Sequence, residues 1–222
     1  MSHSQYPFIP YHREIVDEAK MLENSSMFYK FMNERRTVRD FSDRSVSLEV
    51  MENIILTAST APSGAHKQPW TFCLVSNTDI KKQIRDGAEL EEYNSYHSKM
   101  SKEWLEDIAP LQTDWHKPFL EKAPWLIVIF KRVYEIINEK TRQNYYVQES
   151  VGIATGFLLA AIHNAGLAAL THTPSPMNFL SDVLHRPVNE RPFLLIPVGY
   201  PANDCKVPEL KRKEKEHVIA YY

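Results

Sequence analysis

Three arginines crowd the stretch RRTVR, residues 35–39. Like charges so close repel one another unless an anion lies among them. Arginine suits that purpose, because its planar guanidinium donates two parallel hydrogen bonds to a phosphate or carboxylate. The simpler interpretation is a solvated helix end whose arginines pair with Glu34, Asp40 and Asp43, each exposed pair contributing about 0–1 kcal/mol. On this stretch alone the simpler interpretation is favoured, because short basic motifs often occur without a ligand.

A phosphate is the first anion to consider, and the usual phosphate-binding loops can be sought directly. The chain has six glycines, and none of them forms a GxGxxG or Walker A loop. A Rossmann dinucleotide site and a P-loop are therefore disfavoured. If a phosphate binds, side chains must hold it.

The polar segment 89–117 carries a second set of residues with chemical potential. Glu92 and Tyr96 are four residues apart, so one helical face presents a carboxylate and a phenol, and Lys117 ends the segment. Together these groups can hold the zwitterion of a free amino acid, under a segment that closes as a lid. Glu89 and Tyr93 have the same spacing, so the register is open. A charged surface helix is the simpler interpretation on local grounds.

Two further segments place small or hydroxyl-bearing residues at the ends of expected strands. TAPSGAHKQPW, residues 60–70, puts Pro62, Ser63 and Ala65 in an exposed turn, where a flat ring can approach the backbone. THTP, residues 171–174, puts hydroxyls at a strand end, where ligands often bind.

These segments must be positioned by the regular elements, and the pattern of apolar residues predicts them. The expected helices are 12–34, 47–60, 79–106, 148–166 and 178–185, and the expected strands are 70–76, 125–131, 167–171 and 193–199. Ser47 is expected as an N-cap and Gly166 as a C′ residue. Because helices and strands alternate without a strict βαβ rhythm, we expect one α+β domain over 1–222, with a central mixed sheet flanked by helices.

Both chain ends, about 1–27 and 205–222, carry apolar and aromatic residues outside this pattern. Terminal arms usually fray unless a surface covers their apolar residues. A partner subunit can supply that surface, so we expect a homodimer with exchanged arms.

Composition limits the possible partners. Hydrophobic residues make up 43% of the chain, charged residues 24%, and the net charge is −2, so we expect neither nucleic acid nor an anionic membrane as partner. Cys73 and Cys205 lie in no metal-binding pattern, so no disulfide or metal site is expected and a reducing cytoplasm fits. The N-terminus has no apolar h-region, and the longest apolar run, 151–162, is too short to span a bilayer.

RRTVR, TAPSGAHKQPW, HNAGLAALTHTP, PVGYP and VPELKRK occur in this order. Together they resemble segments of the nitroreductase-like FMN flavoproteins, and more narrowly the iodotyrosine deiodinase branch, from about residue 28 to residue 214. The resemblance implies a nitroreductase-like fold, FMN as cofactor, and sites built at a dimer interface. Animal members begin with a membrane anchor that has no counterpart here, so the chain is similar to a soluble, bacterial form.

The resemblance also implies residue roles at the cofactor. The implied anion is the FMN phosphate, to which Arg212 returns from the C-terminal segment. Thr173 would donate to flavin N5, which favours one-electron steps over hydride transfer. The implied FMN-binding residues are Arg35, Arg36, Thr37, Val38, Arg39, Pro62, Ser63, Thr171, His172, Thr173 and Arg212.

For the substrate, the resemblance implies that Glu92, Tyr96 and Lys117 bind the zwitterion of a halogenated tyrosine. The backbone N–H of Ala65 would donate to its phenolate. The implied reaction is reductive dehalogenation of iodotyrosines, with bromo and chloro analogues, to tyrosine and halide; the electron donor is left open. Two alternatives remain: a general NAD(P)H-dependent nitroreductase or quinone reductase, and a flavin- or amino-acid-binding module without turnover.

Overall fold

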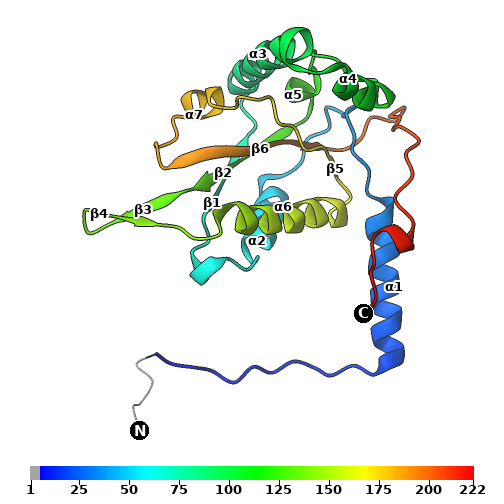
Figure 1. Ribbon diagram of the computed structural model, residues 1–222, viewed down its shortest axis with the longest axis vertical. Helices are drawn as coiled ribbons and strands as arrows, with labels where there is room; N and C mark the ends of the chain where they lie inside the picture. The colour runs from blue at the N-terminus through cyan, green and yellow to red at the C-terminus, as the bar shows by residue number, and fades with distance from the viewer. Residues whose placement is uncertain (1–5) are drawn as a thin grey trace. The chain divides into compact units, whose positions relative to one another are not determined.

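The structure is a computed structural model that describes residues 6–222 (Figure 1). Its contacts separate an N-terminal unit, which ends at Arg35, from a larger unit, Arg36–Tyr222. The larger unit contains the sheet and both hydrophobic clusters. The N-terminal unit therefore extends beyond the arm expected at 1–27. No helix among residues 6–222 is both long and apolar enough to cross a membrane.

The described part of the N-terminal unit, residues 6–35, contains one helix, α1, Glu18–Glu34, and none of the residues of this helix is buried. The expected helix 12–34 is wrong for residues 12–17, because Asp17 is the N-cap and its carboxylate accepts the N–H of Lys20 at 2.7 Å. Large apolar side chains such as Met21, Leu22 and Phe28 stay exposed. A helix with this much exposed apolar surface is suited to a further partner.

The central sheet has four strands in the order β1-β2-β6-β5. Its strands are β1 Trp70–Val75, β2 Trp125–Arg132, β5 Ala168–Ala169 and β6 Glu190–Gly199. All three neighbouring pairs are antiparallel, and a parallel bridge between Thr37 and Ala169 makes the sheet mixed. The expected α+β class with a mixed sheet is confirmed.

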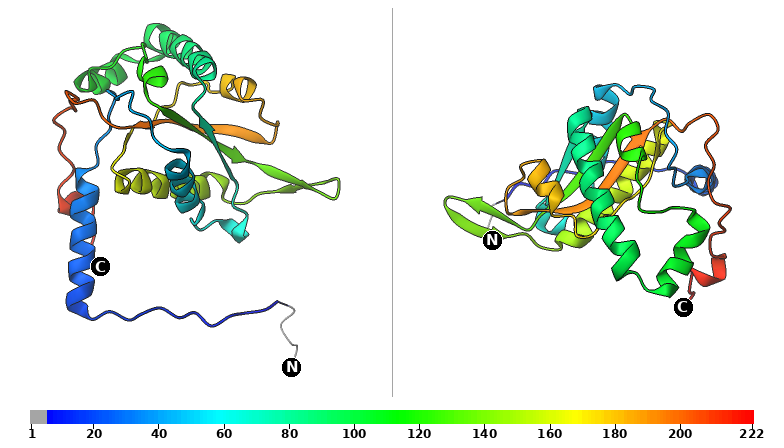
Figure 2. Two further views of the ribbon diagram at one scale, coloured as in Figure 1. Left: turned by 180° about the vertical axis from the view of Figure 1, so that it is seen from behind. Right: turned by 90° about the horizontal axis from the view of Figure 1, so that it is seen from above.

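Helices cover both faces of this sheet, as Figure 2 shows. The helices α2 (Leu48–Ser59) and α6 (Val147–Asn164) pack with one face; α3 (Thr78–Asn94), α5 (Phe119–Lys122) and α7 (Phe179–Val183) pack with the other. Strand β2 serves both layers: Ile127 and Ile129 join the first cluster, and Leu126 and Val128 join the second. This alternation is the period of two that an extended strand imposes.

The predicted helix ends agree with the structure at two points. Ser47 is the N-cap of α2 and its hydroxyl accepts the N–H of Val50 at 3.4 Å. Gly166 follows α6 with φ of +74°, the left-handed conformation that glycine adopts without a Cβ penalty.

The prediction of one continuous helix over 79–106, which includes most of the lid segment, is wrong. The segment divides into α3, a π-helical turn Ser95–Lys99, and α4, Lys102–Ile108, which a 3₁₀ turn Ala109–Leu111 follows. Met100 is extended, and the hydroxyl of Ser101 starts a new helix by accepting the N–H of Trp104 at 3.1 Å. The capping serine therefore overrides an otherwise continuous helical pattern.

The expected strand 167–171 is also shorter than predicted, and one hairpin was missed. Only Ala168–Ala169 pair as β5, while His172 forms an isolated bridge with Leu195. The missed hairpin joins β3, Tyr134–Ile137, to β4, Lys140–Gln143, and projects from the domain (Figure 1). Its two turn residues, Asn138 and Glu139, both have positive φ, and a glutamate in such a turn is an unusual signal.

Candidate functional site

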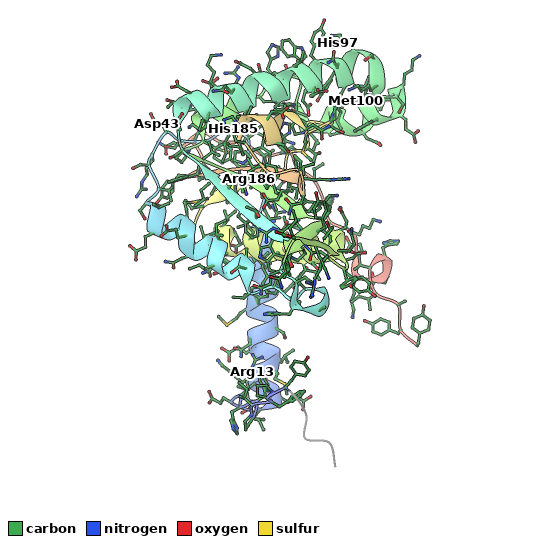
Figure 3. All side chains as sticks on the ribbon, turned by 90° about the vertical axis from the view of Figure 1, so that its left-hand side faces the viewer. Arg13, Asp43, His97, Met100, His185 and Arg186 are labelled. Carbon is green, nitrogen blue, oxygen red and sulfur yellow. The ribbon has the colours of Figure 1, made fainter. Side chains whose placement is uncertain are left out.

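A cavity of about 190 Å³ lies where α3, the loop before α5 and the segment after β5 meet. Met100, labelled in Figure 3 beyond the end of α3, contributes to its lining. Seven of the site residues that the sequence predicted are among its lining residues: Arg39, Glu92, Tyr96, Lys117, Thr171, His172 and Thr173. The cavity therefore combines a helix face, a loop and a strand end that are far apart in the sequence.

A buried ion pair lies in this cavity. Lys117 Nζ is 3.1 Å from Glu92 Oε2, and the two side chains are only 4% and 13% exposed. The ammonium also donates to the carbonyl oxygen of Asp114 and, at 3.5 Å, to Thr113 Oγ1. Buried charges persist only where they are paired, so each charge depends on the other for neutralisation.

Tyr96 lies beside this pair. Its hydroxyl donates to the carbonyl oxygen of Thr113 at 3.1 Å, and Lys117 Nζ is 5.5 Å from its ring centroid. Burial, followed by the nearby Glu92 carboxylate, raises the pKa of Tyr96. The phenol therefore remains a protonated hydrogen-bond donor at neutral pH.

The alternative register, Glu89 and Tyr93, occupies different surroundings. Glu89 Oε1 accepts from Arg85 Nε and from the backbone N–H of Lys117, both at 2.7 Å. Tyr93 is exposed and stacks on His97 with ring centroids 4.0 Å apart. Neither residue lines the cavity, so the geometry favours Glu92 and Tyr96 as the pair that meets a ligand.

His172 lies beneath Glu92 and is 8% exposed. Its Nδ1 is 3.9 Å from Glu92 Oε1, and its Nε2 is a buried atom without a hydrogen-bond partner in the described part of the chain. Burial, with the charges of Lys117 and Arg39, lowers the pKa of His172 to about 3, so the imidazole is neutral. Thr171 and Thr173, on either side of it, are exposed, as alternation along an extended segment requires.

A second cavity, of about 450 Å³, lies beside the first. The arginine stretch, the end of the lid and the C-terminal segment line it: Thr37, Arg39, Asp40, Pro110–Gln112 and Lys206–Glu209. Arg39 lines both cavities. Burial lowers the pKa of Arg39 despite the nearby Tyr96 and Asp40, and its guanidinium forms no ion pair with any carboxylate of residues 6–222. A half-buried guanidinium of this kind suits a polar or anionic ligand.

The rest of RRTVR is built into the edge of the sheet. Val38 is buried and its N–H donates to the carbonyl oxygen of Ala169 at 3.3 Å, next to the bridge that Thr37 forms. Arg36 donates from Nη2 to the carbonyl oxygen of Pro208, and so holds the C-terminal segment against this edge. Arg36 and Arg39 form none of the ion pairs with Asp40 or Asp43 that the simpler interpretation required, within Arg36–Tyr222.

The turn that contains Pro62, Ser63 and Ala65 lies elsewhere. It leads into β1, one edge of the sheet, whereas Thr171–Thr173 follow β5 at the other edge. Two strands separate these edges, which at about 4.8 Å per strand spacing amounts to about 14 Å. Ala65 has φ of +49°, and Ser150 Oγ accepts the N–H of Gly64 at 3.3 Å. None of the three predicted residues lines either cavity, so one chain does not bring Ala65 to Glu92.

The model of the nitroreductase family matches residues 32–200. The chain belongs to the nitroreductase family. Within this family it is 63% identical to the iodotyrosine deiodinase of Haliscomenobacter hydrossis, over 97% of both chains, and 48% identical to that of Nematostella vectensis, over 95% of this chain and 80% of the relative. A crystal structure of an oxidized iodotyrosine deiodinase bound to FMN and 3-iodo-L-tyrosine matches with a TM-score of 0.75 and 31% identity, covering 88% of this chain and 99% of that one.

These similarities confirm the resemblance and the nitroreductase-like fold that the sequence predicted. Arg35 and Arg212 also lie outside both cavities, as do Arg36, Val38 and the three residues of the turn before β1. Arg35 belongs to the N-terminal unit, where it is the C-cap of α1. Arg212 lies in the exposed C-terminal segment and lines neither cavity. Their roles at a nitroreductase-family cofactor stay predictions.

Sequence reasoning missed several residues of this nitroreductase-family site. Met100, Ile108 and Leu111 give the smaller cavity its apolar lining, and the break in the lid helix hid them. Thr113 is the first residue of the stretch TDWHK, residues 113–117, which ends at Lys117, and its hydroxyl was a signal that could have been used. The segment Lys206–Glu209 overlaps the family segment VPELKRK, residues 207–213, but a role was predicted only for Arg212 of that segment.

Proposed function

We propose that the protein is an FMN-dependent enzyme that reductively dehalogenates tyrosines, with 3-iodo-L-tyrosine and 3,5-diiodo-L-tyrosine as substrates. The named relatives and the homologous complex with FMN and 3-iodo-L-tyrosine support this assignment. The observation that carries it is the buried pair of Glu92 and Lys117 beside Tyr96, in a cavity of about 190 Å³. In the reaction the carbon–halogen bond breaks, two electrons and one proton enter, and tyrosine and halide leave.

The pair is suited to a zwitterion for a reason of charge. Glu92 accepts the α-ammonium of the substrate, while Lys117 and the Tyr96 hydroxyl donate to its carboxylate. The pair is neutral before binding, and the complex with a zwitterion is neutral as well. No buried charge is left without a partner in either state.

The residues present fit FMN. The larger cavity, of about 450 Å³, falls within the range of small-molecule sites, and Arg39 brings to it a guanidinium without a carboxylate partner. The hydroxyls of Thr37, Thr171 and Thr173 lie on cavity walls next to it. We assign the phosphate to Arg35, Arg36 and Arg212, and the flavin to Thr37, Val38, Arg39, Pro62, Ser63 and the Thr171–Thr173 segment. FMN, when bound, supplies the electrons.

The protein's own part in the chemistry is to orient the phenol and hold its charge. The backbone N–H of Ala65 donates to the phenolate oxygen, and Thr173 Oγ1 donates to the cofactor from the wall of the cavity. The lid excludes water, which strengthens both interactions.

A complete site requires a homodimer, because in one chain the turn with Ala65 leads into β1 at one edge of the sheet, whereas the cavity that Glu92 lines also contains Thr171–Thr173 at the other edge. In the dimer, Pro62, Ser63 and Ala65 of one protomer complete the cavity of its partner. Three features support this assembly. Ile153 and Phe157 are exposed on α6, Gly152 and Gly156 on the same helix have open space where a Cβ would lie, and the terminal arms expose apolar side chains.

We further propose a cytoplasmic location and NAD(P)H as the ultimate source of electrons. The general nitroreductase alternative is not favoured, because nitroaromatics have no zwitterion for Glu92 and Lys117 to hold.

The proposal is tested by single-turnover reduction without oxygen. FMN-loaded protein is reduced with dithionite and mixed with 3-iodo-L-tyrosine or 2-iodophenol, and iodide and the organic product are quantified. We expect one equivalent of iodide and of tyrosine per flavin, and far slower release from 2-iodophenol. Absence of iodide from 3-iodo-L-tyrosine would overturn the proposed function, and equal rates for both compounds would overturn the zwitterion site.

A further inference from the structure

The loop 113–117, which carries Lys117, is held by three side chains from a single face of α3 and of the π-helical turn Ser95–Lys99 that continues it. Glu89, Tyr93 and Tyr96 follow one another at intervals of four and three residues, so they project from the same side of the helix. Each contacts a different residue of the loop. These contacts run in antiparallel order: Glu89 meets Lys117, Tyr93 meets Trp115, and Tyr96 meets Thr113.

Glu89 makes the contact nearest to the substrate-binding lysine. Its Oε1 accepts the backbone N–H of Lys117 at 2.7 Å, and the same oxygen accepts from Arg85 Nε at 2.7 Å. Arg85 is anchored in turn, because its Nη1 donates to Glu121 of α5 at 3.0 Å. A carboxylate that is held by an ion pair and accepts a backbone N–H is a firm anchor, since its hydrogen bonds are charge-assisted.

Two carboxylates three residues apart therefore bind opposite ends of one lysine. Glu89 holds its backbone, and Glu92 is paired with its ammonium group at 3.1 Å. If the backbone of Lys117 shifted, the ammonium group would shift with it. The position of Lys117 Nζ in the cavity thus depends on Glu89, which itself lines neither cavity.

The other two contacts complete the attachment of the loop. The rings of Tyr93 and Trp115 meet edge to face with centroids 5.3 Å apart, and the hydroxyl of Tyr96 donates to the carbonyl oxygen of Thr113 at 3.1 Å. The chain between these anchors, residues 97–112, leaves α3 and returns to it; Figure 3 labels His97 and Met100 at its start.

We propose that Glu89, supported by Arg85, is a positioning residue that fixes the backbone of Lys117 and so presets its ammonium group for the substrate carboxylate. This inference rests on the proposed function for the identity of the substrate. Its physical content is a loop held in place before the ligand arrives, and preorganisation of this kind lowers the entropic cost of binding.

The test compares Glu89→Ala and Glu89→Gln with Asp86→Asn. Asp86 is a matched control, because it is an exposed carboxylate of the same helix that pairs with Lys82 four residues earlier at 2.7 Å. Glutamine keeps an oxygen that can accept the N–H of Lys117 but loses the ion pair with Arg85. This variant therefore distinguishes the effect of the hydrogen bond from the effect of the ion pair. Three quantities are measured on FMN-loaded protein: the Kd of 3-iodo-L-tyrosine by calorimetry, the KM and kcat for 3-iodo-L-tyrosine and 2-iodophenol, and hydrogen exchange of the Lys117 amide without substrate.

For Glu89→Ala we expect Kd and KM for 3-iodo-L-tyrosine to rise by about tenfold or more, as expected for the loss of one charge-assisted hydrogen bond. The KM for 2-iodophenol should stay unchanged, because this compound does not use Lys117. Exchange of the Lys117 amide should accelerate, Glu89→Gln should have a smaller effect, and Asp86→Asn none. Unchanged exchange at Lys117, or an equal loss for both compounds, overturns the proposal. If the unmodified protein fails to bind 3-iodo-L-tyrosine, the proposed function fails, while the exchange measurement still decides the role of Glu89.

Discussion

Glu190 is buried and Glu92 is largely buried, and both glutamates have cationic neighbours, but their surroundings differ in how completely the carboxylate is bound. Glu190 is 3% exposed and accepts four hydrogen bonds or ion pairs: from Thr71 at 2.6 Å, from Arg132 at 3.3 Å, and from Arg186 at 2.7 and 2.8 Å. Burial raises the pKa of Glu190, but hydrogen bonds from Thr71 and Arg186 more than offset this, and the pKa lies below its usual value.

Glu92 has fewer partners. Its carboxylate meets one cation, Lys117 at 3.1 Å, and a neutral imidazole, His172 at 3.9 Å. Lys117 is shared, because it also donates to a backbone carbonyl group. A fully bound carboxylate holds structure together, whereas one with unused acceptor capacity beside a cavity is available to a ligand. The two clusters thus divide stability and recognition between them.

The largest effect is expected from breaking the Glu190 cluster. Glu190→Ala leaves Arg132 and Arg186 without their buried carboxylate, and the free energy of unfolding should fall by about 3–5 kcal/mol. Urea unfolding measures this, with the exposed Asp86→Asn as control. The affinity of the folded fraction for 3-iodo-L-tyrosine should stay within about twofold, since the cluster does not line the cavity. A decrease in the free energy of unfolding of less than about 1 kcal/mol would contradict the structural role assigned to Glu190.

The regions around His172 and Glu190 are expected to lose stability in different ranges of acidic pH. The pKa of folded His172 is about 3, against 6.5 when exposed. Below pH 6.5 the unfolded chain therefore binds a proton that the folded chain does not, so stability is fully present above 6.5 and falls as the pH drops toward 3. The low pKa of Glu190 adds a loss only below its ordinary value of 4.5.

His172→Gln should therefore flatten the stability profile between pH 6.5 and 4.5, where the native protein loses about 2–3 kcal/mol. Urea unfolding at each pH measures the profile. His217→Gln, which changes an exposed histidine in the C-terminal segment, serves as control. Glu190→Gln should change the profile only below pH 4.5. An identical profile for His172→Gln would show that another group carries the acid sensitivity.

Glu92→Gln tests the recognition side of the comparison. The amide keeps the size of the side chain but loses the charge that pairs with the substrate ammonium, so Kd for 3-iodo-L-tyrosine should rise by about 10- to 100-fold. Calorimetry measures this, and FMN content provides the control for an intact cofactor site. Stability should fall by less than in Glu190→Ala. If the order of the two stability losses were reversed, the division between the clusters would be wrong.

The sequence predicted one of these clusters and not the other, for a physical reason. The helical spacing of Glu92 and Tyr96, with Lys117 at the end of the same polar segment, predicted the first cluster, and the family resemblance selected this pair over Glu89 and Tyr93. Glu190, Thr71 and Arg132 come from three different strands, and no local spacing connects them. Contacts between distant strands depend on register, which the pattern of apolar residues does not specify for polar side chains.

The regular elements were predicted best where burial decides them. Strands β1 and β2 and helices α2 and α6 follow their apolar patterns closely. The lid was predicted worst, because Ser101 interrupts a helix that spacing alone would continue. The turn at Ala65 was located correctly along the chain, but one chain places it before β1, at the edge of the sheet opposite Thr171–Thr173. Its proposed place opposite Glu92 rests on the proposed homodimer. One chain's sequence cannot supply that geometry without the family resemblance.

The smallest effect concerns ligands that carry a single charge. 3-Iodotyramine has only an ammonium group, and 3-(4-hydroxy-3-iodophenyl)propionate has only a carboxylate. The ammonium group would draw Glu92 away from Lys117, which would keep only neutral oxygen partners such as the carbonyl group of Asp114. The carboxylate would draw Lys117 away and leave Glu92 with neutral His172.

Each singly charged ligand thus gains one ion pair and breaks another, whereas uncharged 2-iodophenol leaves the buried pair intact. We therefore expect both charged analogues to bind no more tightly than 2-iodophenol, and at most about tenfold more weakly, the equivalent of about 1.4 kcal/mol. Calorimetric titration of the FMN-loaded protein with the four ligands measures the order. In Glu92→Gln, where no pair has to be broken, the propionate should bind more tightly than 2-iodophenol. If either analogue bound the native protein tenfold more tightly than 2-iodophenol, the pair would open without cost. The contrast between Glu92 as a ligand-binding carboxylate and Glu190 as a structural one would then be wrong.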